Sequence, residues 1–295
     1  EMIGSDWSSD VCSSDLLSSE SLDIVLAKGS KLELFSVTEN GFTPIFEVPI
    51  FGKIAALCKY YHKETNLDRI VLCTDDYHFT VLSGDPATGR VNTVVYGNIK
   101  NRIGRPVDRD YICIVDPSNR ICLLYLYVGT LKIIPLTSEL NAFRAFDIHI
   151  PDLGIRDIQF LPTSDQSIRF ALVCEYHGRR RLKIYNLDVM NRQLVSLAPS
   201  LKEATIPETA SAIIPDRASR SFVLASNTLL QQFDLEGNPL SQLKVALESP
   251  VCWDLIDGGK FLLADANGQI SLLVLAARLS LTSLGHVDAL LAVHY

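Results

Sequence analysis

The sequence has no long uninterrupted run of apolar residues. None of its apolar runs approaches the roughly 20 residues that a transmembrane helix needs. No signal peptide is visible near the start of the chain. We therefore expect a soluble, intracellular protein.

Motifs that indicate catalysis or metal binding are also missing. The GxSxG, P-loop and GxGxxG patterns do not occur. The histidines lack the spacing of metal ligands. The histidines are His62, His78, His149, His177, His286 and His294. The sequence therefore predicts a protein that is not an enzyme and has no catalytic residues, no metal and no cofactor.

The first residues read differently from the rest of the chain. Residues 1–16 are EMIGSDWSSDVCSSDL, and the part from Asp6 to Leu16 back-translates into a common sequencing adapter. We predict that residues 1–16 are an adapter-derived or disordered tail that packs on nothing. The protein proper would then comprise residues 17–295 and be truncated at its C-terminal end.

An excess of positive charge is lacking as well. The chain has 27 Lys and Arg against 34 Asp and Glu, a net charge of −7. Without Glu1, Asp6, Asp10 and Asp15 of the tail the count is 27 against 30, or −3. Because binding to polyanions relies on clustered positive charge, this balance argues against a general nucleic-acid binder.

Outside the tail, none of the cysteines forms a CxxC pair, and each lies in an apolar, strand-like run. These cysteines are Cys58, Cys73, Cys113, Cys122, Cys174 and Cys252. We expect small buried side chains in a reducing compartment, without disulfides or metal.

The chain does contain a repeat of β-hairpins, while helical periodicity is nearly absent. In each hairpin an apolar strand, a small or polar turn and an alternating strand follow one another. The turns fall at Gly29, Asp75–Asp76, Gly129, Gly178, Asn227 and Gly268. They lie roughly 40–53 residues apart, which is the period of a propeller blade of four strands.

These observations predict an all-β protein, a β-propeller of four-stranded antiparallel blades. About six of seven blades would be present, and the propeller would not close within this sequence. Because neighbouring blades cover both faces of inner strands, we expect continuous apolar runs there, as in Ile54–Cys58. Outer strands should alternate, as in Leu32–Phe35.

One stretch, from Gly97 to Leu136, combines a strand meander with a polar loop. Its second half predicts three short antiparallel strands, with turns at Asp116–Asn119 and at Val128–Gly129. Its first half carries Arg102, Arg105 and Arg109. Since binding residues often lie on loops held by a rigid scaffold, this loop is the first candidate site.

The same stretch carries a family resemblance. GNIKNRIGRP, IVDPSNRICLLYLY and LKIIPL resemble the first propeller of the large subunit of the damage-specific DNA-binding complex, an adaptor of cullin–RING ubiquitin ligases. KLELFSVTENGFTPIFEVPIFGKIA and LLADANGQISLLVL are similar to other hairpins of that propeller. The related propeller subunits of splicing and polyadenylation factors match RIGRP and IIPL less well.

The resemblance implies a non-catalytic protein-interaction scaffold that grips substrate receptors, often WD-repeat proteins, and is linked to DNA-damage recognition and protein ubiquitination. Arg102, Arg105 and Asn101 would bind the partner. The cullin would dock on another propeller, absent from this sequence. The resemblance implies a protein of nucleus and cytoplasm with no membrane partner, and any contact with nucleic acid is expected to be indirect.

Three alternatives remain open at this point. The first is a paralogous propeller scaffold of a splicing or mRNA 3′-end-processing complex that binds nucleic acid. The second concerns Arg179, Arg180 and Arg181, which form the strongest basic cluster. They are either a solvated strand start or contacts to phosphate or nucleic acid. Likewise, Arg102 and Arg105 either bind a partner or pin their own loop.

Overall fold

The structure is a computed structural model, and it describes residues 11–14, 16–17, 23–39, 41–108, 111–163, 166–197, 206–275 and 278–286. The chain divides into two compact units, residues 1–147 and residues 148–295. The division falls inside one strand, β12. Each unit is described by itself below.

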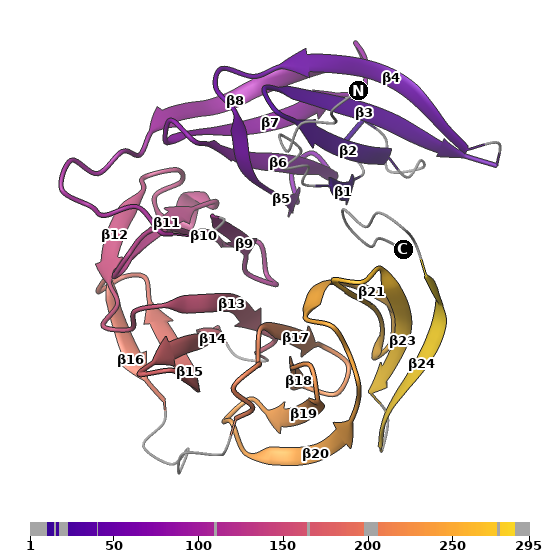
Figure 1. Ribbon diagram of the computed structural model, residues 1–295. Coiled ribbons are helices and arrows are strands. Elements are labelled where there is room, and N and C mark those ends of the chain that lie inside the picture. Colours follow the sequence, from indigo (N-terminus) through magenta and orange to yellow (C-terminus); the bar gives the residue numbers. More distant parts are fainter. Residues whose placement is uncertain are drawn as a thin grey trace, which may run out of the picture. The chain divides into compact units, whose positions relative to one another are not determined.

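The first unit folds as antiparallel sheets of four strands, in the orders β1-β2-β3-β4, β5-β6-β7-β8 and β12-β11-β10-β9 (Figure 1). The strands are β1 Val11–Ser14, β2 Asp23–Lys28, β3 Lys31–Thr38, β4 Gly41–Pro49, β5 Ile54–His62, β6 Leu67–Thr74, β7 His78–Asp85, β8 Arg90–Asn98, β9 Ile112–Val115, β10 Ile121–Tyr127, β11 Thr130–Pro135 and β12 Phe146–His149. A single-turn 3₁₀ helix, η1 Ser138–Leu140, precedes β12.

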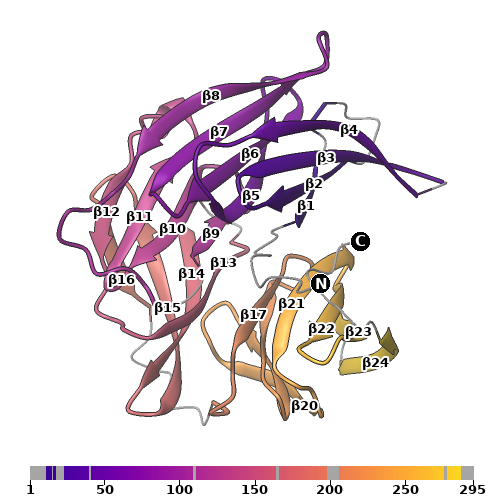
Figure 2. The same ribbon diagram turned by 45° about the horizontal axis from the view of Figure 1, so that its top comes forward.

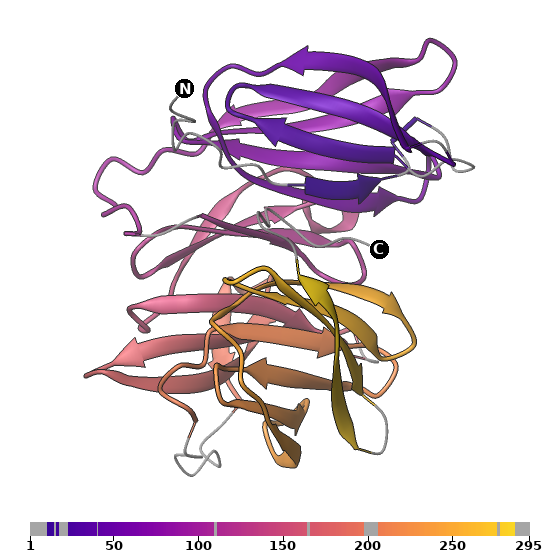
Figure 3. The ribbon, with the colours of Figure 1, turned by 45° about the vertical axis from the view of Figure 1, so that its right-hand side comes forward.

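The second unit repeats this pattern with the orders β13-β14-β15-β16, β17-β18-β19-β20 and β21-β22-β23-β24. The strands are β13 Ile155–Leu161, β14 Ile168–Tyr176, β15 Arg179–Asp188, β16 Gln193–Ser196, β17 Ala212–Asp216, β18 Ser221–Ala225, β19 Leu229–Asp234, β20 Pro239–Lys244, β21 Pro250–Asp257, β22 Lys260–Asp265, β23 Gln269–Leu275 and β24 Leu279–His286. Figure 3 shows the antiparallel strands of each unit from another side.

Each predicted hairpin turn joins the second and third strands of one sheet, so each sheet corresponds to one predicted blade. Gly29, Gly129, Gly178 and Gly268 have φ angles between 57° and 81°, a conformation that glycine adopts without steric cost. At Asp75–Asp76 the positive φ of 64° falls on the next residue, Tyr77. The alternating pattern of the sequence therefore located the blades correctly.

Burial follows the position of a strand within its sheet. Every residue of β10 and of β18 is buried, whereas β4 and β8 are largely exposed. The apolar core lies between adjacent sheets of the same unit. In the first unit one cluster joins the sheets of β6 and β10, and another joins those of β2 and β6. In the second unit, two further clusters join the sheets of β14, β18 and β22.

The strands with continuous burial are not the ones expected from the sequence. Ile54–Cys58 lies in β5, the first strand of its sheet, where buried and half-buried residues alternate. Continuous burial falls instead on the second strands, such as β6 and β10. Each of these is flanked by a strand on either side and covered by a neighbouring sheet of its unit on one face at least. Leu32–Phe35, predicted to alternate, does so in β3.

The structure also differs from the prediction that residues 1–16 pack on nothing. Val11–Ser14 form β1, which pairs antiparallel with β2, and Leu16 is buried in the apolar core. The backbone oxygen of Leu16 lies so close to Gly84 that a Cβ there would clash with it. Strand pairing uses backbone groups, so almost any extended segment can pair with the free edge of β2. The adapter origin of this segment stays a prediction, and residues 1–10 lie outside the described part.

No helix among the described residues is long and apolar enough to cross a membrane.

Truncating a side chain on a second strand should destabilise the fold. Leu124 in β10 is fully buried in the core of the first unit. We expect Leu124→Ala to lower the free energy of unfolding by about 3 kcal/mol, because it loses apolar contacts and leaves a cavity. Urea titration followed by circular dichroism measures this. The control is Val94→Ala on the exposed strand β8, which should change stability by less than about 0.5 kcal/mol. Equal effects would contradict the assigned core.

In the second unit, a carboxylate links two neighbouring sheets. Asp157 of β13 accepts a hydrogen bond from the backbone N–H of Ile213 in β17 at 2.7 Å. It also accepts one from the side chain of Gln159 at 3.3 Å. Burial nevertheless raises the pKa of Asp157 from 3.8 to about 6. The charged form is therefore disfavoured in the folded state.

This shift gives stability a pH dependence of known sign. Because the pKa is higher in the folded state, the folded state binds the proton more tightly, and Asp157 favours folding most below pH 3.8. That contribution is lost as the pH rises through about 6. Asp157→Asn keeps an acceptor for Ile213 and removes the charge. We expect the variant to gain up to about 3 kcal/mol relative to the parent between pH 4 and pH 7. Thermal melts across this range measure the difference in stability between variant and parent, and Asp76→Asn on an exposed turn is the control. If the stability of Asp157→Asn depended on pH in the same way as that of the parent, the raised pKa of Asp157 would be contradicted.

Candidate partner-binding loop

The loop that joins β8 to β9 in the first unit carries the arginines singled out from the sequence (Figure 2). The structure describes it as far as Asp108. Arg109 lies outside the described residues. The loop begins at Ile99, whose buried side chain anchors it. The N–H of Ile99 donates to the carbonyl of Tyr77 at 2.8 Å.

The backbone of the loop is fastened to the end of β10. The N–H of Asn101 donates to the hydroxyl of Tyr127 at 3.0 Å. Further along, the N–H of Val107 donates to the carbonyl of Leu126 at 3.1 Å. The N–H of Val128 donates to the carbonyl of Arg105 at 2.9 Å. Three hydrogen bonds over seven residues leave the loop little conformational freedom.

The ring of Tyr127 forms the support beneath the loop. It stacks on Tyr77 with ring centroids 5.0 Å apart and an interplanar angle of 15°. A Cβ on Gly104 would lie 2.6 Å from the Tyr127 ring, so only glycine lets the loop approach this closely. Burial raises the pKa of Tyr127, and the hydroxyl stays protonated at neutral pH.

Three side chains point away from this support into solvent. Ile103 is 95% exposed, and it stands between the exposed Arg102 and Arg105. Arg105 pairs with Asp108 at 3.2 Å in an exposed ion pair, which contributes little to stability. Arg102 makes no hydrogen bond or ion pair with any residue that the structure describes. The backbone of the loop is held without Arg102, and partner binding by Arg102 and Arg105 stays a prediction.

Unlike Arg102, Asn101 forms a side-chain hydrogen bond within the loop. Its side-chain oxygen accepts the N–H of Ile103 at 3.0 Å, and the residue is half-buried. This bond forms an Asx turn that shapes the tip of the loop. A contact between Asn101 and a partner stays a prediction.

An exposed aromatic patch, which the sequence did not indicate, lies beside the loop. It consists of Phe51, His78 and Tyr96. Phe51 and Tyr96 are 74% and 54% exposed. His78 stacks on Tyr96 at 5.2 Å and meets Phe51 edge-on at 5.8 Å. Asn98 connects patch and loop, since its amide donates to His78 Nε2 at 3.0 Å and its oxygen accepts the N–H of Lys100 at 2.9 Å.

The basic cluster of the second unit is partly neutralised. Arg180 pairs with Glu175 at 2.5 Å and donates to the carbonyl of Glu208 at 3.2 Å. Arg181 lies over the ring of Tyr176, with 4.4 Å between its guanidinium carbon and the ring centroid. Arg179 is exposed at the hairpin turn. Arg180 is thus held by the fold, and only Arg179 and Arg181 stay available to phosphate.

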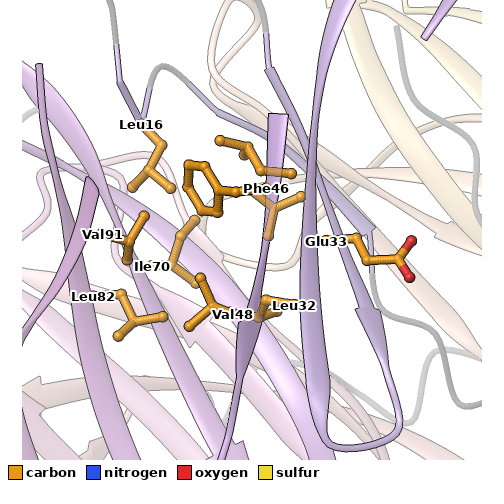
Figure 4. Close-up of a pocket in the computed structure, with 10 residues that line it drawn as sticks. Leu16, Leu32, Glu33, Phe46, Val48, Ile70, Leu82 and Val91 are labelled. Atoms are coloured by element: carbon orange, nitrogen blue, oxygen red, sulfur yellow. The ribbon is translucent and has the colours of Figure 1, made fainter. Parts of the chain in front are cut away.

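A cavity between the sheets of β3 and β6 in the first unit offers no binding site (Figure 4). Its volume is about 10 Å³, and its walls include Leu16, Phe46 and Ile70. A space of this size holds one water molecule at most, and an apolar lining keeps it dry. It is a small packing gap.

The structure also brings together three cysteines that no sequence motif connects. The sulfurs of Cys58 and Cys113 are 2.9 Å apart, those of Cys113 and Cys122 3.7 Å, and those of Cys58 and Cys122 4.0 Å. Hydrogen bonds from Cys113 and Cys58 lower the pKa of the Cys122 thiol to about 5. Their separations of 55 and 9 residues match no metal motif, so only the fold reveals the group.

Four-stranded antiparallel blades and a rigid exposed loop define a propeller scaffold. The family model for the RSE1/DDB1/CPSF1 first beta-propeller matches residues 9–290, and the chain belongs to this family. The predicted fold class, an all-β propeller of four-stranded antiparallel blades, is thereby confirmed. The resemblance of the sequence to the first propeller of this family is confirmed as well.

Curated relatives point the same way. The chain is 26% identical over 264 residues to DNA damage-binding protein 1a of Arabidopsis thaliana. It is 27% identical over 269 residues to DNA damage-binding protein 1 of Solanum lycopersicum, and 28% over 270 residues to that of Oryza sativa subsp. japonica. Each match covers 90% of this chain but 24% of the relative. The chain therefore spans about a quarter of the length of these relatives.

Removing the hydroxyl of Tyr127 should loosen the loop without disturbing the core. In Tyr127→Phe the N–H of Asn101 loses its acceptor, while the ring still packs beneath Gly104. We expect a loss of about 1 kcal/mol in unfolding free energy and faster hydrogen exchange at the Asn101 amide. Tyr96→Phe is the matched control, since the Tyr96 hydroxyl makes no hydrogen bond within the described residues. Unchanged exchange at Asn101 would show that the hydroxyl does not hold the loop.

Proposed function

We propose that this chain is a non-catalytic protein-interaction scaffold, the first propeller of a cullin–RING ubiquitin ligase adaptor that grips substrate receptors. The observation that carries the proposal is the fastened loop with Arg102, Ile103 and Arg105 directed into solvent. The naming of its relatives as DNA damage-binding proteins supports the particular adaptor and a link to DNA-damage recognition.

The chemistry of the loop suits the end of a helix on a partner. A guanidinium can donate two parallel hydrogen bonds to a carboxylate, and it can cap the last carbonyls of a helix. Ile103 adds an apolar anchor between the two arginines. Since the backbone is already fixed, little conformational entropy is lost when a partner binds.

The aromatic patch extends this surface. Phe51 and Tyr96 offer the type of side chain that dominates binding energy in protein interfaces. An apolar stripe on a receptor would pack there while its acidic or carbonyl groups meet the arginines. A receptor helix of a WD-repeat protein is the partner we propose.

Other partners follow from the same assignment. A cullin would bind through another propeller of the whole protein, which this chain does not contain. Nucleic acid would be reached through the receptor. Such a protein would act in nucleus and cytoplasm.

The alternative is a paralogous scaffold of a splicing or mRNA 3′-end-processing complex. The matching family carries three names, RSE1, DDB1 and CPSF1, so it is compatible with both assignments. Direct binding of nucleic acid would rest on Arg179 and Arg181, because the guanidinium of Arg180 is already paired with Glu175. Two exposed charges supply little of the salt-dependent affinity of nucleic-acid binders.

The test measures receptor binding and stability on the same variants. In a full-length protein that carries this propeller, Arg102 and Arg105 are both changed to Ala, and Ile103 is changed to Asp separately. We expect binding of a WD-repeat receptor helix to weaken by about 1–3 kcal/mol in each variant, since charge-assisted bonds or an apolar anchor are lost. Calorimetric titration gives the affinities.

The control is Arg90→Ala, an exposed arginine on β8 away from the loop. It should leave affinity unchanged, and all variants should keep stability within about 0.5 kcal/mol. If affinity holds while the melting temperature drops, the arginines pin their loop and the proposal fails. Tight binding of RNA by the parent protein, lost in Arg179→Ala with Arg181→Ala, would support the alternative.

A further inference from the structure

The three cysteines near the loop's supporting sheet are held by strands of two neighbouring sheets in the first unit. Cys113 in β9 is opposite Leu124, and Cys122 in β10 is opposite Val115. Cys122 is two residues along β10 from Leu124, the residue opposite Cys113. Because every second residue of a strand faces the same side, the side chains of Cys113 and Cys122 share one face of the sheet. Cys58 in β5 approaches from the adjacent sheet, because β5 and β9 lie side by side.

The distances among the three sulfurs are close to those of a thiolate metal site. With metal–sulfur bonds of about 2.3 Å, two ligands are about 3.8 Å apart in a tetrahedral site and about 4.0 Å in a trigonal one. The pairs of Cys122 measure 3.7 and 4.0 Å. The Cys58–Cys113 pair, at 2.9 Å, would have to open by about 1 Å.

The surroundings of the sulfurs select a soft ion. Among the described residues, the possible ligand atoms gathered here are three sulfurs, with no histidine or carboxylate. Cys122 is fully buried in the apolar cluster that joins the sheets of β6 and β10, and the half-buried Cys58 and Cys113 pack against that cluster. Thiolate ligands favour Cu(I) and Zn(II) over Mg(II), Ca(II) or Mn(II).

Nearby groups reduce the cost of burying negative charge there. Tyr60 is buried in the same apolar cluster and follows Cys58 by two residues in β5, so the two side chains share one face of the strand. Arg69 donates to the Tyr60 hydroxyl at 3.5 Å. The Nε atom of Arg69 is buried without a hydrogen-bond partner within the described residues. Arg69 therefore places a cation next to Tyr60, which shares its strand face with Cys58.

We propose that Cys58, Cys113 and Cys122 form a binding site for a single Cu(I) ion with three sulfur ligands. Zn(II) is the less suitable ion, because structural zinc sites have four ligands and the described residues supply three. Cu(I) is a soft ion that thiolates select, and it enters by displacing thiol protons.

The test is an anaerobic titration of the reduced chain with Cu(I), in competition with the chelator bathocuproine disulfonate. We expect one Cu(I) per chain to be retained against the chelator, with ultraviolet sulfur-to-copper charge-transfer absorption. Cu(I) should also raise the melting temperature, because it binds the folded state. Zn(II), titrated separately, should bind more weakly.

Variants locate the site. Cys122→Ala should lower Cu(I) affinity by about 100-fold or more. Even residues that only hydrogen-bond to a ligand change metal affinity 10- to 100-fold when mutated, and loss of a ligand itself should have at least that effect. Cys58→Ala, at a half-buried position, should do the same and covers the case that Cys122→Ala fails to fold. Cys73→Ala is the matched control, because Cys73 is a buried thiol of the same core and is not one of the three.

Several results would overturn the proposal. One is failure of the parent chain to retain Cu(I) against the chelator. Another is retention that is equal in the parent, Cys58→Ala and Cys122→Ala. A third is tighter binding of Zn(II) than of Cu(I). An air-formed disulfide between Cys58 and Cys113 in a chain that takes up no Cu(I) after reduction would likewise exclude the metal site.

Discussion

Burial of the second strand between neighbouring strands and sheets is the constraint on which the fold depends. β10 and β18 are buried at every residue, so a polar side chain there loses its hydration and needs a hydrogen-bond partner, as Ser221 has in Gln232. Antiparallel pairing satisfies the backbone of these strands from both sides. The exposed fourth strands, such as β8, and the turns then tolerate polar and irregular sequence.

That core is what makes the candidate loop rigid. Tyr127 stands at the end of β10, and its position is fixed by the buried residues before it. Its hydroxyl and ring hold Asn101 and Gly104 in place. The loop that carries the exposed arginines and Ile103 is held by this support, so one side chain connects the candidate loop to the core.

Different parts of the candidate sites were visible in the sequence to different degrees. Arg102 and Arg105 were found because a polar loop before an apolar meander is a local pattern. The aromatic patch was missed, since Phe51, His78 and Tyr96 come from separate strands and turns. Arg180 was counted as an available charge, because its pairing with Glu175 requires the hairpin to be folded. The cysteine group was missed because its members come from three strands.

The sequence by itself determined the blades. Alternation of apolar and polar residues, glycine at the hairpin turns and a regular period are local properties, and they placed every predicted hairpin turn correctly. Tertiary structure decided which strands are continuously buried, that Val11–Ser14 pair with β2, and which side chains meet. These outcomes depend on contacts between residues far apart in the chain. The periodicity of a single strand carries no information about the neighbour that will cover it.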